Sequence, residues 1–287
     1  MNEVKKLLLS LLCLSILSSC GNGKSGEETD DGGSDTSHVV DQTQMVSAQN
    51  IFNSVPAPAE VSEMIERTNL DYDGTVLNNP DNYKKYTTDD YKALNLGVYG
   101  TDLSYTSVFD QSQESLVYLT CVNQACRSLG ISGVFDQKTF DRIDANKQNK
   151  DSLLQIISKS FWAADKFLKE NKRANTSTLM VAGGWIEGIY LAANIAKLSN
   201  DKRIIQKIIA QKNSLKDLIT LLESSKLSPD VAFICENLKQ ISPLFDDATA
   251  TPTEVKKDEK ETVATPNPFI KSLDEKITPL RKKVTMN

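Results

Sequence analysis

Two carboxylates, Asp102 and Glu187, lie within otherwise apolar segments that have helical spacing. A carboxylate in such a setting must be paired, protonated or open to a cavity. If both lined one cleft, they could act as a general acid and a general base, although the sequence does not supply the distance between them. The other interpretation is a satisfied network of tyrosine, asparagine and carboxylate groups inside the core.

Aromatic and amide side chains share a helix face with each carboxylate. They are Tyr190 and Asn194 beside Glu187, and Tyr91, Asn95 and Tyr105 beside Asp102. A pocket with a polar floor and an aromatic rim would suit a sugar, a peptide or a lipid head group. The predicted binding residues are Asn95, Tyr99, Asp102, Tyr105, Trp185, Glu187 and Tyr190.

Other site chemistries have little support in the sequence. The single histidine, His38, lies in a polar tail, which nearly excludes histidine catalysis and histidine metal sites. Cys121, Cys126 and Cys235 lack zinc spacing and are interpreted as small buried hydrophobes, although Cys235 could pair with one of the other two. Nucleotide-binding and nucleophile motifs are missing, so we expect no metal and no cofactor. A net charge of −5 without a basic block argues against nucleic acid.

The segment 176–198 is predicted to be the central helix that positions Glu187. Apolar residues cover most of its circumference, and such a helix must be buried. A carboxylate at the centre of a bilayer costs about 2.5–3.5 kcal/mol even on the mildest scale. We therefore expect a protein core around this helix rather than a membrane.

Glycines lie inside two predicted helices, 88–109 and 176–198. A glycine within a helix costs about 0.5–1 kcal/mol relative to alanine, so an offsetting gain is needed. Close approach of two crossing helices would supply that gain, and we predict that these helices touch at their glycines. The alternative is that the glycines leave room for a ligand. The residues are Gly97, Gly100, Gly183, Gly184 and Gly188.

Caps, proline starts and amphipathic spacing predict the remaining helices. No segment shows the sustained alternation of a strand. We predict an all-α fold, a globular bundle of about seven to nine helices in antiparallel pairs around the helix at 176–198. The other predicted helices are 56–67, a start at 79–80, 113–129, 136–147, 151–172, 200–224 and 228–244.

The N-terminus has the pattern of an export signal. Lys5 and Lys6 precede the apolar run 7–17, and small residues then lead to Cys20. This pattern resembles the bacterial lipoprotein cleavage box, which implies that Cys20 is acylated and anchors the chain in a membrane. Gly21 after the cysteine favours the outer membrane, by analogy with sorting in Gram-negative bacteria.

Composition divides the chain into five parts. We predict a signal peptide at 1–19, an acidic tether at 20–48, a helical domain at 49–245, a linker at 246–266, and an amphipathic helix with its tail at 267–287. Pro279 should bend or end that last helix. The helix is interpreted as a strap that docks back on the domain, or alternatively as a partner-binding or membrane-surface helix.

Two motifs suggest kinship. The run ALNLGVYGTDLSY at 93–105 and the run GGWIEG at 183–188 resemble those of an uncharacterised all-helical family of bacterial lipoproteins, over roughly residues 51–198. The resemblance implies a cell-envelope location and a helical fold, and it implies no activity.

These observations favour a lipid-anchored envelope protein whose helical domain binds an envelope protein or a small ligand, with no evident catalysis. One alternative is a carboxylate-dependent enzyme that acts on envelope glycan or peptide through Glu187 and Asp102. A second alternative is a purely structural envelope component.

Overall fold

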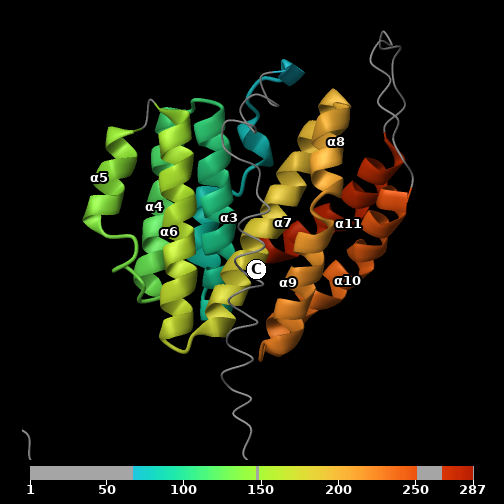
Figure 1. Cartoon of the computed structure of the whole chain (residues 1–287). Helices are drawn as coiled ribbons and strands as arrows, with labels where there is room; N and C mark the ends of the chain where they lie inside the picture. The colour runs from blue at the N-terminus through green and yellow to red at the C-terminus, as the bar shows by residue number, and fades with distance from the viewer. Residues whose placement is uncertain (1–66, 147–148, 251–266, 287) are drawn as a thin grey trace, which may run out of the picture. The chain divides into compact units, whose positions relative to one another are not determined.

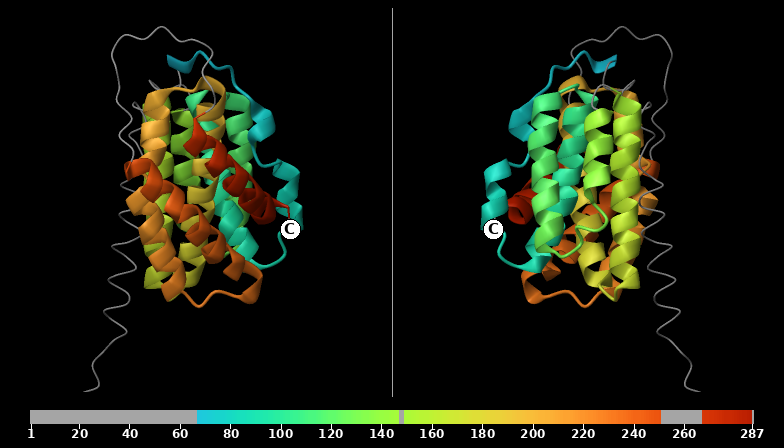
Figure 2. Two further views of the ribbon diagram at one scale, coloured as in Figure 1. Left: turned by 90° about the vertical axis from the view of Figure 1, so that its right-hand side faces the viewer. Right: turned by 90° about the vertical axis from the view of Figure 1, so that its left-hand side faces the viewer.

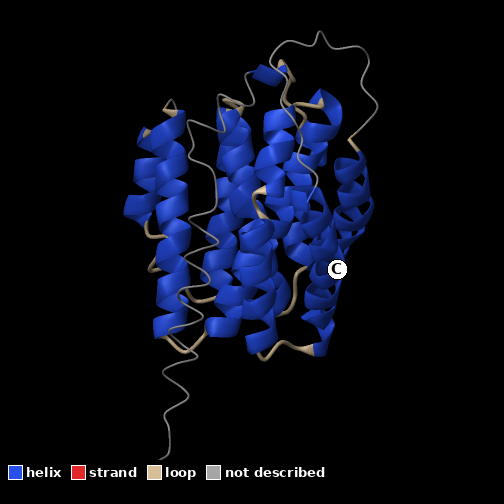
Figure 3. Cartoon of the chain, turned by 45° about the vertical axis from the view of Figure 1, so that its right-hand side comes forward, coloured by secondary structure: helices blue, strands red, loops and turns tan. Residues whose placement is uncertain are grey.

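The described part of the chain is built from helices. The computed structural model describes residues 67–146, 149–250 and 267–286, and within them it has nine α-helices, two 3₁₀ helices and no strand (Figures 1 and 3). The all-α prediction is therefore confirmed. The predicted signal peptide, the acidic tether and the helix at 56–67 fall outside the described residues, apart from Arg67. The elements are η1 (Gly74–Val76), η2 (Pro80–Lys85), α3 (Asp89–Val108), α4 (Ser112–Ser128), α5 (Gln137–Ala145), α6 (Lys150–Glu170), α7 (Ala174–Ser199), α8 (Lys202–Ile209), α9 (Lys212–Ser224), α10 (Pro229–Ala250) and α11 (Pro268–Thr285).

Several helix ends follow from local side-chain chemistry. The side chains of Thr88 and Asp136 accept hydrogen bonds from backbone N–H groups in the first turns of α3 and α5. Asn79 does the same before η2, which begins at Pro80. After α4 the chain turns through Gly130 at φ +68°, a left-handed conformation that glycine adopts without a Cβ penalty. These ends are the ones that the sequence predicted.

The single helix predicted at 200–224 is wrong, because two helices, α8 and α9, occupy this segment. The N–H of Gln211 bonds to the carbonyl of Ile208, a three-residue spacing that interrupts the α-helical ladder. The apolar spacing of the sequence continues across this break and could not reveal it.

Helices α10 and α11 both continue through a proline. The predicted end of one helix at 244 is therefore wrong, and of the two outcomes predicted for Pro279, a bend or an end, the end does not occur. Pro243 lies inside α10, which continues past the predicted end at 244, and Pro279 lies inside α11 without ending it. A proline removes one helical hydrogen bond, and packing of the flanking residues offsets that loss. The flanking residues, all 0% exposed, are Ile241, Phe245, Ile277 and Leu280.

The long helix α7 occupies the centre of the described fold. It packs against α3, α6, α8, α9 and α11, and in Figure 1 it lies between the green helices and the orange and red ones. By length and composition α7 is the one described helix that could cross a membrane, and 67% of its most apolar window is buried inside the protein. The predicted buried central helix is confirmed.

Helices α3 and α7 touch backbone to backbone at glycines. A Cβ atom on Gly97 would lie 2.0 Å from the carbonyl oxygen of Met180, and one on Gly183 would lie 1.9 Å from the carbonyl oxygen of Leu94. The predicted contact between the two helices is therefore confirmed.

Two of the predicted contact glycines behave differently. The space beside Gly100 is filled by the ring of Phe161 from α6, and no atom lies within 4 Å of a Cβ built on Gly188. The prediction for Gly188 is wrong, because a Cβ at this position would meet open space rather than α3.

The C-terminal helix docks on the bundle. Helix α11 packs against α7, α10 and α3, and it crosses them obliquely in Figure 2. The strap interpretation is therefore the one that the structure supports. The apolar side chains that α11 buries are Ile270, Leu273, Ile277, Leu280 and Val284.

Candidate functional site

A buried ion pair joins α7 to α11. Glu187 is 0% exposed, and both its oxygens bind the guanidinium of Arg281. The Nε of Arg281 donates to Oε2 and its Nη2 donates to Oε1, each at 2.9 Å. The same Nη2 also reaches the carbonyl oxygen of Val76 at 3.2 Å. Such two-bond pairing is among the strongest charge-assisted contacts in proteins.

Asp102, on α3, lies in the same buried cluster. It is 0% exposed, and one oxygen accepts the backbone N–H of Asn78 at 3.3 Å. As a carboxylate, its Oδ1 finds no hydrogen-bond donor among the described residues. Burial, and then the negative charge of Glu187, raise the pKa of Asp102 well above its ordinary value, although Arg281 opposes the shift. A proton on Asp102 would let its side chain donate a hydrogen bond to Glu187.

The closed cluster limits what these carboxylates can do. Asp102 and Glu187 do lie together, as the acid–base hypothesis requires, but neither has any exposed surface. Arg281 neutralises Glu187, and the nearby charges raise the pKa of Arg281 although burial alone would lower it. The arrangement is therefore a buried polar network, as in the other interpretation, with one oxygen of Asp102 left without a donor. Sequence reasoning missed Arg281, because it lies 94 residues beyond Glu187.

Asn95 and Tyr99 are buried within the same region of α3. The amide nitrogen of Asn95 donates to the carbonyl oxygens of Tyr91 and Val284, both at 2.9 Å, so it binds the last turn of α11. The hydroxyl of Tyr99 donates to the carbonyl oxygen of Asn79 at 3.2 Å, and burial raises the pKa of Tyr99.

Tyr105 and Trp185 pack elsewhere. The centre of the Tyr105 ring lies 5.7 Å from that of the Tyr72 ring and 4.8 Å from that of the Phe109 ring. The ring centres of Trp185 and Phe245 lie 6.4 Å apart. The structure therefore does not gather the predicted binding residues around one cavity, because most of these aromatic rings pack into separate parts of the core. Their role in binding stays a prediction.

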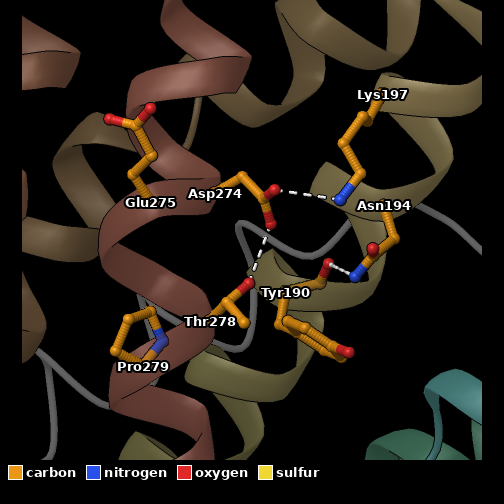
Figure 4. Close-up of a pocket in the computed structure, with 7 residues that line it drawn as sticks. All are labelled: Tyr190, Asn194, Lys197, Asp274, Glu275, Thr278 and Pro279. Atoms are coloured by element: carbon orange, nitrogen blue, oxygen red, sulfur yellow. Dashed lines mark hydrogen bonds and ion pairs between the residues drawn. The ribbon is translucent and has the colours of Figure 1, made fainter.

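An open cavity of about 370 Å³ lies between α7 and α11, and Tyr190 is the predicted binding residue that lines it (Figure 4). The guanidinium of Arg281 lies 4.7 Å from the centre of the Tyr190 ring, which joins the cavity to the buried cluster. We call this space the α7–α11 cavity. Its lining residues are Tyr190, Asn194, Lys197, Asp274, Glu275, Thr278 and Pro279.

Polar contacts order the walls of the α7–α11 cavity. Lys197 forms an ion pair with Asp274 at 2.9 Å across the cavity, and Thr278 donates to the other oxygen of Asp274 at 2.8 Å (Figure 4). The amide nitrogen of Asn194 donates to the carbonyl oxygen of Tyr190 at 2.9 Å. The cavity therefore presents one aromatic ring and several groups that can bond a polar ligand.

The described residues contain no group of three or more His, Cys, Asp or Glu side chains that could hold a metal ion. Cys121, Cys126 and Cys235 are free and buried, so the possible pairing with Cys235 is not formed. Burial raises the pKa of Cys121 to about 11, which keeps this thiol protonated at neutral pH.

No protein-family model, no curated protein and no solved structure matches this chain. The resemblance to a lipoprotein family, drawn from the two sequence motifs, therefore stays a prediction.

Proposed function

We propose that the chain is a lipid-anchored protein of the bacterial cell envelope whose helical domain binds a small ligand in the α7–α11 cavity, without catalysis. The observation that carries the proposal is this cavity of about 370 Å³, which has an aromatic side chain and several polar groups at its wall. Small-molecule sites have volumes of about 300–1,000 Å³ and combine apolar surface with a few placed polar groups.

The closed state of the two carboxylates supports binding over chemistry. Glu187 and Asp102 are both 0% exposed, and Glu187 is bound by Arg281 through two hydrogen bonds. A general acid or base must come within hydrogen-bond reach of its substrate. The polar side chains of the α7–α11 wall, by contrast, do line a cavity.

Binding is tested with the full chain in detergent micelles. Small glycans, peptides and metabolites extracted from envelopes are screened by calorimetry, and the ligand found is then measured against Asn194→Ala. We expect at least a fivefold loss of affinity, because the removed amide belongs to the cavity wall. Asn237→Ala is the matched control, since Asn237 makes the same bond to a carbonyl one turn earlier in α10.

Two results would contradict the proposed binding site. Equal loss of affinity in both asparagine variants would place the ligand elsewhere. Turnover of envelope polysaccharide that disappears in Glu187→Gln would favour the enzyme alternative. A chain that binds nothing in the screen would favour a structural role.

The lipid anchor is a separate part of the proposal, and it depends on the sequence around Cys20. We expect mass spectrometry of the mature chain to find acyl groups on Cys20, and Cys20→Ala to move the protein from the outer-membrane fraction to a soluble fraction. Recovery of an unmodified, secreted wild-type chain would contradict the anchor without affecting the cavity.

A further inference from the structure

Three ionisable side chains from three helices meet where α11 docks on the bundle. Asp102 of α3 and Glu187 of α7 are both 0% exposed, and Arg281 of α11 binds the two oxygens of Glu187 at 2.9 Å. The cluster therefore holds two acids and one base. If both acids were ionised, one negative charge would stay buried without a partner, which is strongly unfavourable in a protein interior.

The hydrogen bonds around Asp102 also favour a bound proton. Its Oδ1 finds no donor in the described part of the chain, and its other oxygen accepts a long bond of 3.3 Å from the N–H of Asn78. A proton between Asp102 and Glu187 supplies a donor and leaves one negative charge for Arg281 to balance. Burial, and then the charge of Glu187, raise the pKa of Asp102, and both effects exceed the opposing effect of Arg281.

Of the three helices that form this cluster, α11 is the one that can move away. Helices α3 and α7 touch backbone to backbone at Gly97 and Gly183, which fixes their spacing. Helix α11 crosses the other helices at the surface of the bundle (Figure 2), and hydrogen bonds from Asn95 and Tyr86 hold its end. When α11 lifts, water reaches both carboxylates, and the effect of burial on the pKa of Asp102 is lost.

We propose that docking of α11 requires one proton on the Asp102–Glu187 pair, so that α11 is a strap that detaches from α3 and α7 as the pH rises. The docked form binds this proton more tightly than the detached form, and loss of the proton therefore favours detachment. The ratio of detached to docked chains rises by at most about tenfold per pH unit. Because α11 forms one wall of the α7–α11 cavity, detachment also opens that cavity. This device goes beyond the proposed ligand binding and does not depend on it.

The tyrosine and cysteine side chains around Asp102 do not titrate in the range that the test uses. Burial raises the pKa of Tyr86 to about 12 and that of Cys121 to about 11, and it raises those of Tyr99 and Tyr118 as well. These four groups therefore stay neutral up to pH 8. The groups that face Asp102 are Glu187 from α7, Arg281 from α11, Tyr86 from η2, Tyr99 from α3, and Tyr118 and Cys121 from α4, while α6 meets α3 with the apolar ring of Phe161.

Hydrogen exchange of the full chain at pH 5 and pH 8, followed by mass spectrometry of peptides, tests the strap. The wild type is compared at each pH with Asp102→Asn, which keeps a donor for Glu187 and cannot ionise, so the intrinsic pH dependence of exchange cancels. Between the two pH values, the opening of peptides from 267–286 should increase at least tenfold more in the wild type than in Asp102→Asn. Asp89→Asn, an exposed change on the same helix, should behave as the wild type.

A second variant gives an independent test. Glu187→Gln leaves one acid and one base in the cluster, which is then neutral without a proton. The opening of α11 in Glu187→Gln, corrected for intrinsic exchange, should not rise between pH 5 and pH 8. A rise as large as that of the wild type, in this variant or in Asp102→Asn, would overturn the proton requirement. An equal rise in wild-type peptides from α4 and α9 would overturn the strap, because the whole domain would then open together.

Discussion

Arg281 binds Glu187 through two hydrogen bonds of 2.9 Å, and this pair joins the C-terminal helix to the centre of the bundle. Two carbonyls at the end of α11 are bound as well, since Asn95 donates to Val284 and Tyr86 donates to Thr285. Helix α11 forms one wall of the α7–α11 cavity. The buried pair therefore determines where that wall lies.

Removal of the guanidinium should strongly destabilise the fold. Arg281→Met leaves Glu187 buried without a partner, and breaking a buried pair in this way costs about 3–5 kcal/mol. The free energy of unfolding is measured by urea denaturation. Lys282→Met, the exposed neighbour, removes the same charge and should change stability by less than about 0.5 kcal/mol.

The double variant Glu187→Leu/Arg281→Met separates charge from packing. Replacing both partners with apolar groups removes the unpaired charge. The double variant should therefore recover most of the stability that Arg281→Met loses, measured as the free energy of unfolding. A double variant no more stable than Arg281→Met alone would show that the side-chain volume, rather than the ion pair, holds α11.

Asp102 should make stability depend on pH. Its folded pKa is raised above the unfolded value, so its contribution is complete below pH about 4 and is lost as the pH rises toward the folded pKa. Asp102→Asn keeps an acceptor for Asn78 and a donor for Glu187 and cannot ionise. The free energy of unfolding of the variant should therefore increase relative to that of the wild type as the pH rises, by at most about 1.4 kcal/mol per pH unit.

Urea unfolding between pH 4 and pH 8 measures this difference. Asp89→Asn, an exposed change in the first turn of the same helix, is the control and should show no comparable rise. A constant difference between Asp102→Asn and the wild type would mean that Asp102 is ionised in the folded protein.

The glycine contact between α3 and α7 should not accept a methyl group. In Gly183→Ala the new Cβ would meet the carbonyl of Leu94 at 1.9 Å, so the two helices must separate. We expect a loss of about 1–3 kcal/mol or more in the free energy of unfolding. Gly188→Ala, on the same helix in open space, should instead stabilise by about 0.5–1 kcal/mol. Equal effects in the two variants would contradict the assigned contact.

Local patterns predicted much of this fold. Apolar spacing, caps and proline starts depend on neighbours within a few residues, and they located α3, α4, α6 and α7 to within a few positions. The glycines of α3 and α7 also predicted a long-range contact, because their cost within a helix requires compensation. The break between α8 and α9, and the continuation of helices through Pro243 and Pro279, depend on tertiary packing and could not be predicted in this way.

The candidate site was less predictable, because its parts come from distant segments. Helical spacing placed Glu187, Tyr190 and Asn194 on one face of α7, and that face does meet α11. The sequence could not indicate that Arg281 would enter the core and close off both carboxylates. Without that partner, a buried acid and an accessible catalytic acid have the same sequence pattern.

A second buried ion pair, also missed by the sequence analysis, should be as important for the fold as the first. Lys169 and Asp165 lie one turn apart on α6 with side chains 1% and 7% exposed, and Nζ lies 2.9 Å from Oδ1. Ser177 of α7 donates its hydroxyl to the same carboxylate, so the pair holds the start of α7 against the end of α6.

Lys169→Met should lower the free energy of unfolding by about 3–5 kcal/mol, because the Asp165 charge remains buried. Lys166→Met, which breaks an exposed pair with Glu170 on the same helix, should cost less than about 1 kcal/mol. Similar losses in the two lysine variants would show that water reaches Asp165 and that the junction between α6 and α7 is held by apolar packing instead.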